Sequence, residues 1–158
     1  SYMIKAREKQ AIEVEKKFGL HKTIFFRLTD AKLNHEIELV REDIELLLEK
    51  YKPGKIFIPS FRDVHPNHRA VTKIMLDIVK NKNIEILGYE VWSFTDENLP
   101  KIYYDITPYF KDKMQMIRIF KQTEWISVYL QYIPLYLRAI RFGRKINVRY
   151  AERFYRIN

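Results

Sequence analysis

The middle of the chain alternates strand-like and helical segments, and this alternation limits the folds that it can adopt. Short apolar runs at Lys55–Pro59 and at about Glu85–Trp92 have the length and composition of buried strands. Between them, Pro66 begins a segment whose apolar residues repeat at helical spacing, and proline is favoured in the first turn of a helix. Strands that a helix connects usually lie parallel. The pattern therefore predicts an α/β fold with a mainly parallel sheet flanked by helices.

Further elements are expected on both sides of this region. We predict helices over residues 4–18 (ended by Gly19), 35–51 (capped by Asn34) and 109–121, a strand at Thr23–Leu28, a turn at Asp105–Pro108, and an apolar segment at Trp125–Ile140 that Pro134 interrupts. The chain shows no internal repeat and no low-complexity stretch. Its 158 residues fit a single domain, so we expect one domain over residues 1–158.

The positive charge is concentrated in the last third of the chain. The net charge is +9, and residues 101–158 contain 12 Lys/Arg against 4 Asp/Glu. Between Tyr136 and Asn158 the basic residues alternate with Tyr and Phe, a composition that suits a nucleic acid or an anionic membrane surface. A basic, partly buried helical flank that packs on the sheet is the alternative. No RNA-recognition or helix-turn-helix signature occurs, so we do not expect a nucleic-acid partner.

Cysteine content and hydropathy exclude several kinds of site and of protein. The chain has no cysteine, which excludes a disulfide framework, a thiolate nucleophile and a zinc site with cysteine ligands, and favours a reducing, cytoplasmic setting. The longest stretch without charge, Trp125–Leu137, is too short to cross a bilayer. We therefore expect no transmembrane segment.

Two histidines follow the strand at Lys55–Pro59. His65 and His68 are three residues apart around Pro66, so they share one face of the predicted helix. They would lie beyond the carboxyl end of a strand, where open α/β sheets bind ligands, and the helix N-terminus favours the neutral imidazole that binds metal. Asp63 would orient one imidazole. Two solvated or hydrogen-bonded histidines and a solvated aspartate remain the alternative. A catalytic zinc usually needs three protein ligands, and this segment offers at most two.

The segment around these histidines resembles a known family. PSFRDVHPNHRAV, residues 59–71, is similar to the second signature of the PIG-L/LmbE zinc-dependent N-acetylglucosaminyl deacetylases, which usually reads HPDHRA. Weaker similarities follow in order along nearly the whole chain, at Arg7 with Ala11 and Phe18-Gly19, Asp30, Tyr89–Ser93, Asp105–Thr107 with Lys113 and Lys121-Gln122, and Tyr150–Phe154. The resemblance implies a Rossmann-like fold.

The resemblance also implies roles for individual residues. His68 would be a zinc ligand, and His65 would stabilise or protonate the tetrahedral intermediate. Arg7 and Asp30 would contact the sugar. The implied reaction is the removal of an acetyl group from an N-acetylglucosamine-type sugar or glycoconjugate.

The chain also departs from the family pattern. The family begins with a strand ending in HPDDE, which supplies two metal ligands and the general base, and no such segment occurs here. We expect an N-terminally incomplete domain, a fragment of a larger molecule, that is inactive alone and takes its other zinc ligands from that segment. Asn67 replaces the usual Asp, and Gln10 replaces a usual Glu, which would alter substrate contacts.

Two further expectations concern binding. The alternative function is a non-catalytic remnant of the same fold, which binds a sugar or a polyanion through the basic flank at Arg141, Arg144 and Lys145. An uncovered sheet edge would favour a homo-oligomer.

Overall fold

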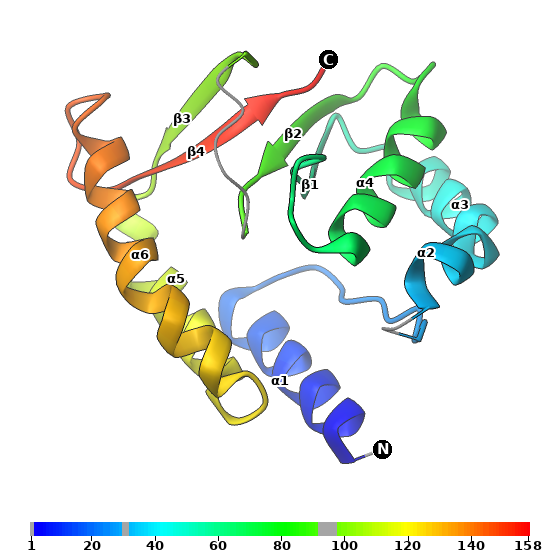
Figure 1. Ribbon diagram of the computed structural model, residues 1–158, viewed down its shortest axis with the longest axis horizontal. Coiled ribbons are helices and arrows are strands. Elements are labelled where there is room, and N and C mark those ends of the chain that lie inside the picture. The colour runs from blue at the N-terminus through cyan, green and yellow to red at the C-terminus, as the bar shows by residue number, and fades with distance from the viewer. Residues whose placement is uncertain (1, 30–31, 92–97) are drawn as a thin grey trace. The chain divides into compact units, whose positions relative to one another are not determined.

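The computed structural model describes residues 2–29, 32–91 and 98–158, and the chain divides into two compact units (Figure 1). The first, which we call the sheet unit, comprises Phe26–Ile102 and Arg153–Asn158. The second, which we call the helical unit, comprises Ser1–Phe25 and Tyr103–Glu152. The two candidate histidines belong to the sheet unit, and most of the basic C-terminal third belongs to the helical unit.

The sheet has four strands in the order β1-β2-β4-β3. β1 (Lys55–Pro59) and β2 (Glu85–Tyr89) pair in parallel along their whole length. β4 (Ala151–Arg156) runs antiparallel to β2, and β3 (Lys101–Asp105) comes last in the order. The predicted α/β class is confirmed, with a four-stranded sheet flanked by helices, and the antiparallel strand makes the sheet mixed.

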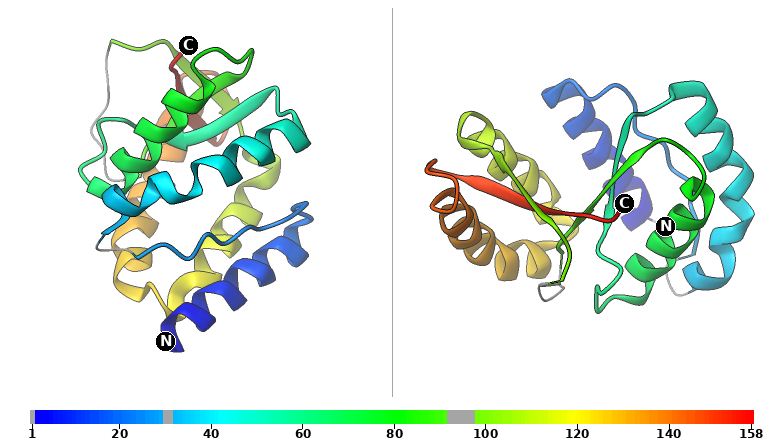
Figure 2. Two further views of the ribbon diagram at one scale, coloured as in Figure 1. Left: turned by 90° about the vertical axis from the view of Figure 1, so that its right-hand side faces the viewer. Right: turned by 90° about the horizontal axis from the view of Figure 1, so that it is seen from above.

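The helix between the two parallel strands forms the core of the sheet unit. α4 (Pro66–Val79) begins at the predicted proline. Its Ile74 and Ile78 are buried against Ile58 of β1 and Ile86 of β2, and burial of a side chain of this size contributes about 1.5–3 kcal/mol. α4 also lies beside the helical residues 33–51, which precede β1 (Figure 2). This packing fixes the start of α4 next to the end of β1.

The single helix predicted over residues 35–51 is divided. It consists of α2 (Leu33–Glu36), a 3₁₀ helix (Ile37–Val40) and α3 (Arg41–Tyr51). Residues three apart eclipse one another in a 3₁₀ helix, so Ile37 and Val40, at its two ends, are both buried in the same core. The prediction that Asn34 caps the helix is wrong, because α2 begins at the residue before it.

The strand predicted at Thr23–Leu28 is also wrong. The segment is irregular, and it pairs with no strand in the described part of the chain. The backbone N–H of Thr23 donates to the carboxylate of Glu15, and Arg27 adopts a positive φ of 55°, which interrupts the extended run. A strand needs a neighbour for its backbone hydrogen bonds, and the residue pattern does not show whether one is available.

Two of the strands were not predicted. β3 ends at Asp105, the first residue of the predicted turn, and β4 lies within the basic flank. Ala151 and Tyr155 of β4 are almost fully buried, so this part of the flank is a strand of the sheet and not a helix that packs on it.

The helical unit contains α1 (Tyr2–Phe18), α5 (Phe110–Ile119) and α6 (Trp125–Gly143), with α5 beside α6 (Figure 2). α1 ends before Gly19, whose φ of 68° is left-handed, as predicted. Pro134 does not interrupt α6. α6 ends at Gly143, where a Cβ would lie 2.5 Å from the carbonyl oxygen of Val148, so the close approach of the chain that follows requires glycine.

Candidate active site

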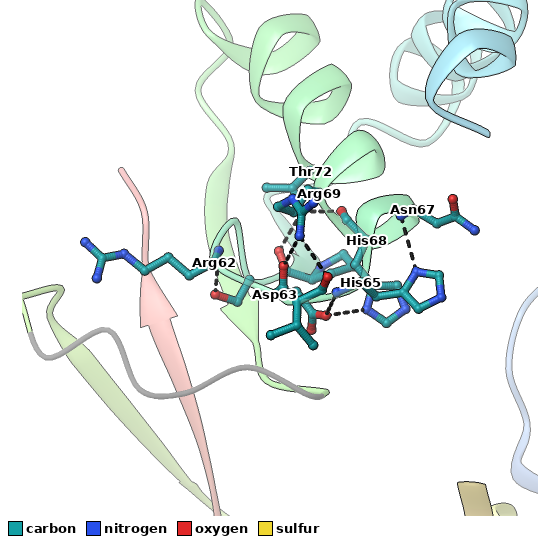
Figure 3. A network of polar contacts seen from close by, with 10 residues as sticks. Arg62, Asp63, His65, Asn67, His68, Arg69 and Thr72 are labelled. Atoms are coloured by element: carbon teal, nitrogen blue, oxygen red, sulfur yellow. Dashed lines mark hydrogen bonds and ion pairs between the residues drawn. The ribbon is translucent and has the colours of Figure 1, made fainter. Parts of the chain in front are cut away.

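The loop between β1 and α4 carries the candidate site at the carboxyl end of β1 (Figure 3). Asp63 lies at its centre and is 1% exposed. Its Oδ1 accepts a hydrogen bond from the backbone N–H of His65 at 2.9 Å. A buried carboxylate with backbone donors has few alternative positions, so Asp63 fixes the path of the loop into α4.

His65 is the N-cap of α4. Its backbone is extended, with φ −78° and ψ 122°, and its Nδ1 accepts the backbone N–H of Asn67 at 3.2 Å. Pro66 at the next position has no N–H that would need a partner. Because Nδ1 acts as an acceptor, the neutral imidazole carries its proton on Nε2. The exposed ring of His65 therefore presents an N–H donor.

His68 lies one turn into α4, against the same carboxylate. Its Nδ1 is 3.1 Å from Oδ1 of Asp63, close enough for an ion pair, although this buried nitrogen makes no aligned hydrogen bond. The side chain is 28% exposed, and the ring centroids of His65 and His68 are 4.9 Å apart. The structure thus brings together the two imidazoles and Asp63, as the i, i+3 spacing predicts.

Two residues of α4 that were not predicted hold the loop. Arg69 Nη1 donates to the carbonyl oxygens of Asp63 and Val64, both at 2.8 Å. The buried Thr72 hydroxyl lies 2.7 Å from the carbonyl oxygen of Pro59 and 3.0 Å from that of His68. Thr72 thereby ties the end of β1 to the turn of α4 that carries His68.

The end of β2 adds a second group of polar residues to this edge. Burial raises the pKa of the Tyr89 hydroxyl, and the negative charge of Asp63 raises it further, so the phenol stays protonated. The next residue, Glu90, accepts hydrogen bonds at Oε1 from Arg153 Nη2 at 2.7 Å and from the hydroxyl of Tyr155 at 2.5 Å. Glu90 is 63 residues away in sequence from Arg153 and 65 from Tyr155, so no local pattern could have predicted these contacts.

The donors of the loop suit one part of a metal site. Imidazole nitrogen is a common zinc ligand, and a carboxylate behind the ring is the usual support for such a ligand. His68 fits this arrangement, because its Nδ1 faces Asp63 and its Nε2 remains as the atom that could bind a metal ion. Among the described residues, no three His, Cys, Asp or Glu side chains are placed to hold a metal ion together.

The other predicted residues lie elsewhere. Arg7 is on α1 of the helical unit, half-exposed, and forms an ion pair with Glu124. Asp30 lies outside the described residues. Gln10 is buried within the helical unit, where Nε2 donates to the carbonyl oxygen of Ile119 at 2.8 Å and Oε1 accepts from Thr123 Oγ1 at 2.6 Å. Gln10 therefore has a structural role in the helical unit.

Comparison with protein families identifies the first half of the chain. Residues 1–79, which include the β1–α4 loop, match the model of the PIG-L family, described as GlcNAc-PI de-N-acetylase. No helix of the described residues combines the length and apolar character needed to cross a membrane.

Solved structures share the fold over almost the whole chain. The N,N'-diacetylchitobiose deacetylase of Pyrococcus horikoshii superposes with a TM-score of 0.79 at 23% identity, over 98% of this chain and 64% of that enzyme. The conserved protein TT1542 of Thermus thermophilus gives 0.75 at 17% identity, over 98% of this chain and 74% of that protein. A deacetylase of teicoplanin biosynthesis gives 0.64 at 14% identity, over 96% and 72%. The chain thus spans less than two thirds of the length of the Pyrococcus enzyme.

Proposed function

Because the chain belongs to the PIG-L family, we propose that the protein is a metal-dependent hydrolase that removes the acetyl group from an N-acetylglucosamine-type sugar. The observation that carries this proposal is the position of His65 and His68 beside the buried Asp63 at the carboxyl end of β1. Ligands of open α/β sheets bind at this edge. Residues 1–158, with both units, would belong to one deacetylase domain.

The proposal assigns His68 to the metal. When bound, zinc or another divalent ion polarises an amide carbonyl and lowers the pKa of a bound water. His68 would bind the ion through Nε2, while Asp63 faces Nδ1 and keeps the ring in place. The other ligands and the general base would come from outside these 158 residues, as the family resemblance implies.

His65 would act on the oxygen of the tetrahedral intermediate. Its Nδ1 accepts the Asn67 N–H, so the proton of the neutral ring is on Nε2, where it can be donated to an oxyanion. A donor of this kind typically contributes about 10²–10³-fold to the rate. The protonated imidazole would have to give up the N-cap bond, so the geometry favours hydrogen-bond donation by the neutral ring.

Substrate contacts complete the proposal. Arg7 and Asp30 would bind the sugar, and the substrate would be an N-acetylated sugar or a conjugate of one. The likeness of the fold to an N,N'-diacetylchitobiose deacetylase and to a deacetylase of teicoplanin biosynthesis supports a sugar amide as the group that is hydrolysed. The reducing setting suggested by the absence of cysteine supports a cytoplasmic location.

The test is the release of free amine from N-acetylglucosamine and N,N'-diacetylchitobiose by the natural, full-length protein. We expect a chelator to abolish release, His68→Ala to reduce it to background, and His65→Ala to lower kcat by about a hundredfold. His35→Ala, at an exposed histidine of α2 in the same unit, is the matched control and should change nothing. Full activity of His68→Ala, or activity that persists after chelation, would contradict the proposal.

A further inference from the structure

One face of α6 exposes a continuous stripe of large apolar side chains. Its members are between 39% and 66% exposed, and they are Trp125, Ile126, Tyr129, Leu130, Ile133, Tyr136 and Leu137. Their spacing places them on one side of the helix, opposite the buried Val128, Ala139 and Phe142. We call this set the α6 stripe. Patches of contiguous apolar surface on this scale generally mark a site of interaction.

A basic, aromatic pocket adjoins the α6 stripe. It has a volume of about 450 Å³ and lies between α5 and α6. Phe110 stacks on Tyr150 in its wall with the ring centroids 3.8 Å apart, and Tyr136 belongs both to this wall and to the stripe. Three cationic residues line it, namely Lys111, Arg118 and Arg149, and none of its lining residues in the described part of the chain is acidic. The pocket therefore suits an anionic group.

The charge of the chain follows the same division. The helical unit contains 15 Lys/Arg against 7 Asp/Glu, whereas the sheet unit contains 14 against 13. Within the helical unit, cations lie against the aromatic rings of α6, with Lys121 Nζ 5.0 Å from the ring centroid of Tyr129 and Arg118 Cζ 5.5 Å from that of Tyr132. The apolar face thus has a basic border.

We propose that α6 lies flat on a membrane surface rich in anionic phospholipid. The α6 stripe enters the boundary between headgroups and acyl chains, where Trp and Tyr are favoured, and the pocket between α5 and α6 receives a phosphate headgroup. Charge complementarity selects this occupant. A second copy would bring one net positive unit against another, and the phosphates of a nucleic acid would leave Leu130, Ile133 and Leu137 without an apolar partner.

The test is sedimentation of the natural, full-length protein with phosphatidylglycerol-containing vesicles and with pure phosphatidylcholine vesicles. We expect binding to the anionic vesicles only, with a fall on addition of salt. The double variant Leu130→Asn/Ile133→Asn should lower the vesicle partition coefficient at least about tenfold. Leu46→Asn is the matched control, because Leu46 of α3 and Leu130 are both 62% exposed, and it should bind as the unmodified protein does.

A second pair of variants tests the basic pocket. Lys111→Glu/Arg149→Glu should reduce binding to anionic vesicles, whereas Lys80→Glu/Lys82→Glu, at exposed positions of the sheet unit, should reduce it much less. Equal binding to neutral vesicles would overturn the proposal. Vesicle binding that is unchanged in the Leu130→Asn/Ile133→Asn variant would also overturn it. So would a protein that binds no vesicles but forms a dimer, if this variant converts that dimer to a monomer. A protein that binds inorganic phosphate to saturation but does not bind vesicles would likewise overturn it.

Discussion

The two units of the chain place their polar groups differently. Four polar residues count as buried over their whole surface in the described part of the chain, and three of them, Ser60, Asp63 and Thr72, lie in or against the β1–α4 loop of the sheet unit. The fourth, Gln10, joins α1 to the end of α5 in the helical unit. Buried polar groups are costly unless they are satisfied, so they indicate where a backbone must be held in one position. The sheet unit holds a loop that bears two histidines, and the helical unit presents an apolar and basic surface.

The largest effect on this comparison should come from Asp63. Replacement with Asn keeps the size of the side chain but removes its negative charge. That charge faces His68, and it contributes to the raised pKa of Tyr89. We expect a loss of about 1–3 kcal/mol in the free energy of unfolding, measured by urea denaturation, and a metal affinity lower by about 10–100-fold. Asp43→Asn, at an exposed position of α3, is the control and should change stability by less than about 0.5 kcal/mol. Equal behaviour of the two variants would show that Asp63 does not organise the loop.

A paired comparison of Thr72 and Gln10 should give a smaller effect. Thr72→Val leaves the carbonyl oxygen of Pro59 without its hydroxyl partner, and Gln10→Leu removes the amide donor from that of Ile119. Each should cost about 1–2 kcal/mol of stability. Because only Thr72 is bound to the turn that carries His68, Thr72→Val should also reduce metal affinity, whereas Gln10→Leu should not.

Thr72→Ser restores the hydroxyl and serves as the control for this pair. It should recover metal affinity, although the lost methyl group lowers stability slightly. If Gln10→Leu weakened metal binding as much as Thr72→Val, the contrast between the two units would be wrong.

The smallest effect concerns an exposed ion pair of the sheet. A hydrogen bond from Lys55 lowers the pKa of Glu85, and a second from Arg156 lowers it further. The folded carboxyl is therefore the stronger acid, so its contribution to stability is present above the pKa of the unfolded chain and is lost as the pH falls through the folded value. Glu85→Gln should be less stable than the unmodified protein at neutral pH and equally stable in strong acid. A difference that grows on acidification would contradict this sign.

The sequence was sufficient for the parts of the fold that depend on local pattern. The strand at Lys55–Pro59 and the proline at the start of α4 follow from composition and backbone preference, and the spacing of His65 and His68 already places them together. The strand at Thr23–Leu28 was wrong because pairing depends on a neighbour that a local pattern does not reveal. For the same reason β3 and β4 were missed.

The supporting residues of the site were predictable to different degrees. Asp63 stands two residues before the capping histidine, a spacing at which an aspartate commonly accepts a backbone N–H. Arg69 and Thr72 lie on the helical segment but carry no signal that they turn back to the loop. The contact of Glu90 with Arg153 joins residues 63 positions apart, which pattern alone does not link.

The most direct test of the central claim is the metal content of the natural, full-length protein. We would measure bound zinc per chain after dialysis, for the unmodified protein and for His68→Ala and His35→Ala. The account predicts about one ion per chain in the unmodified protein and in His35→Ala, and none in His68→Ala. The same metal content in all three, or no metal in any of them, would contradict the assignment of the β1–α4 loop as part of a metal-dependent active site.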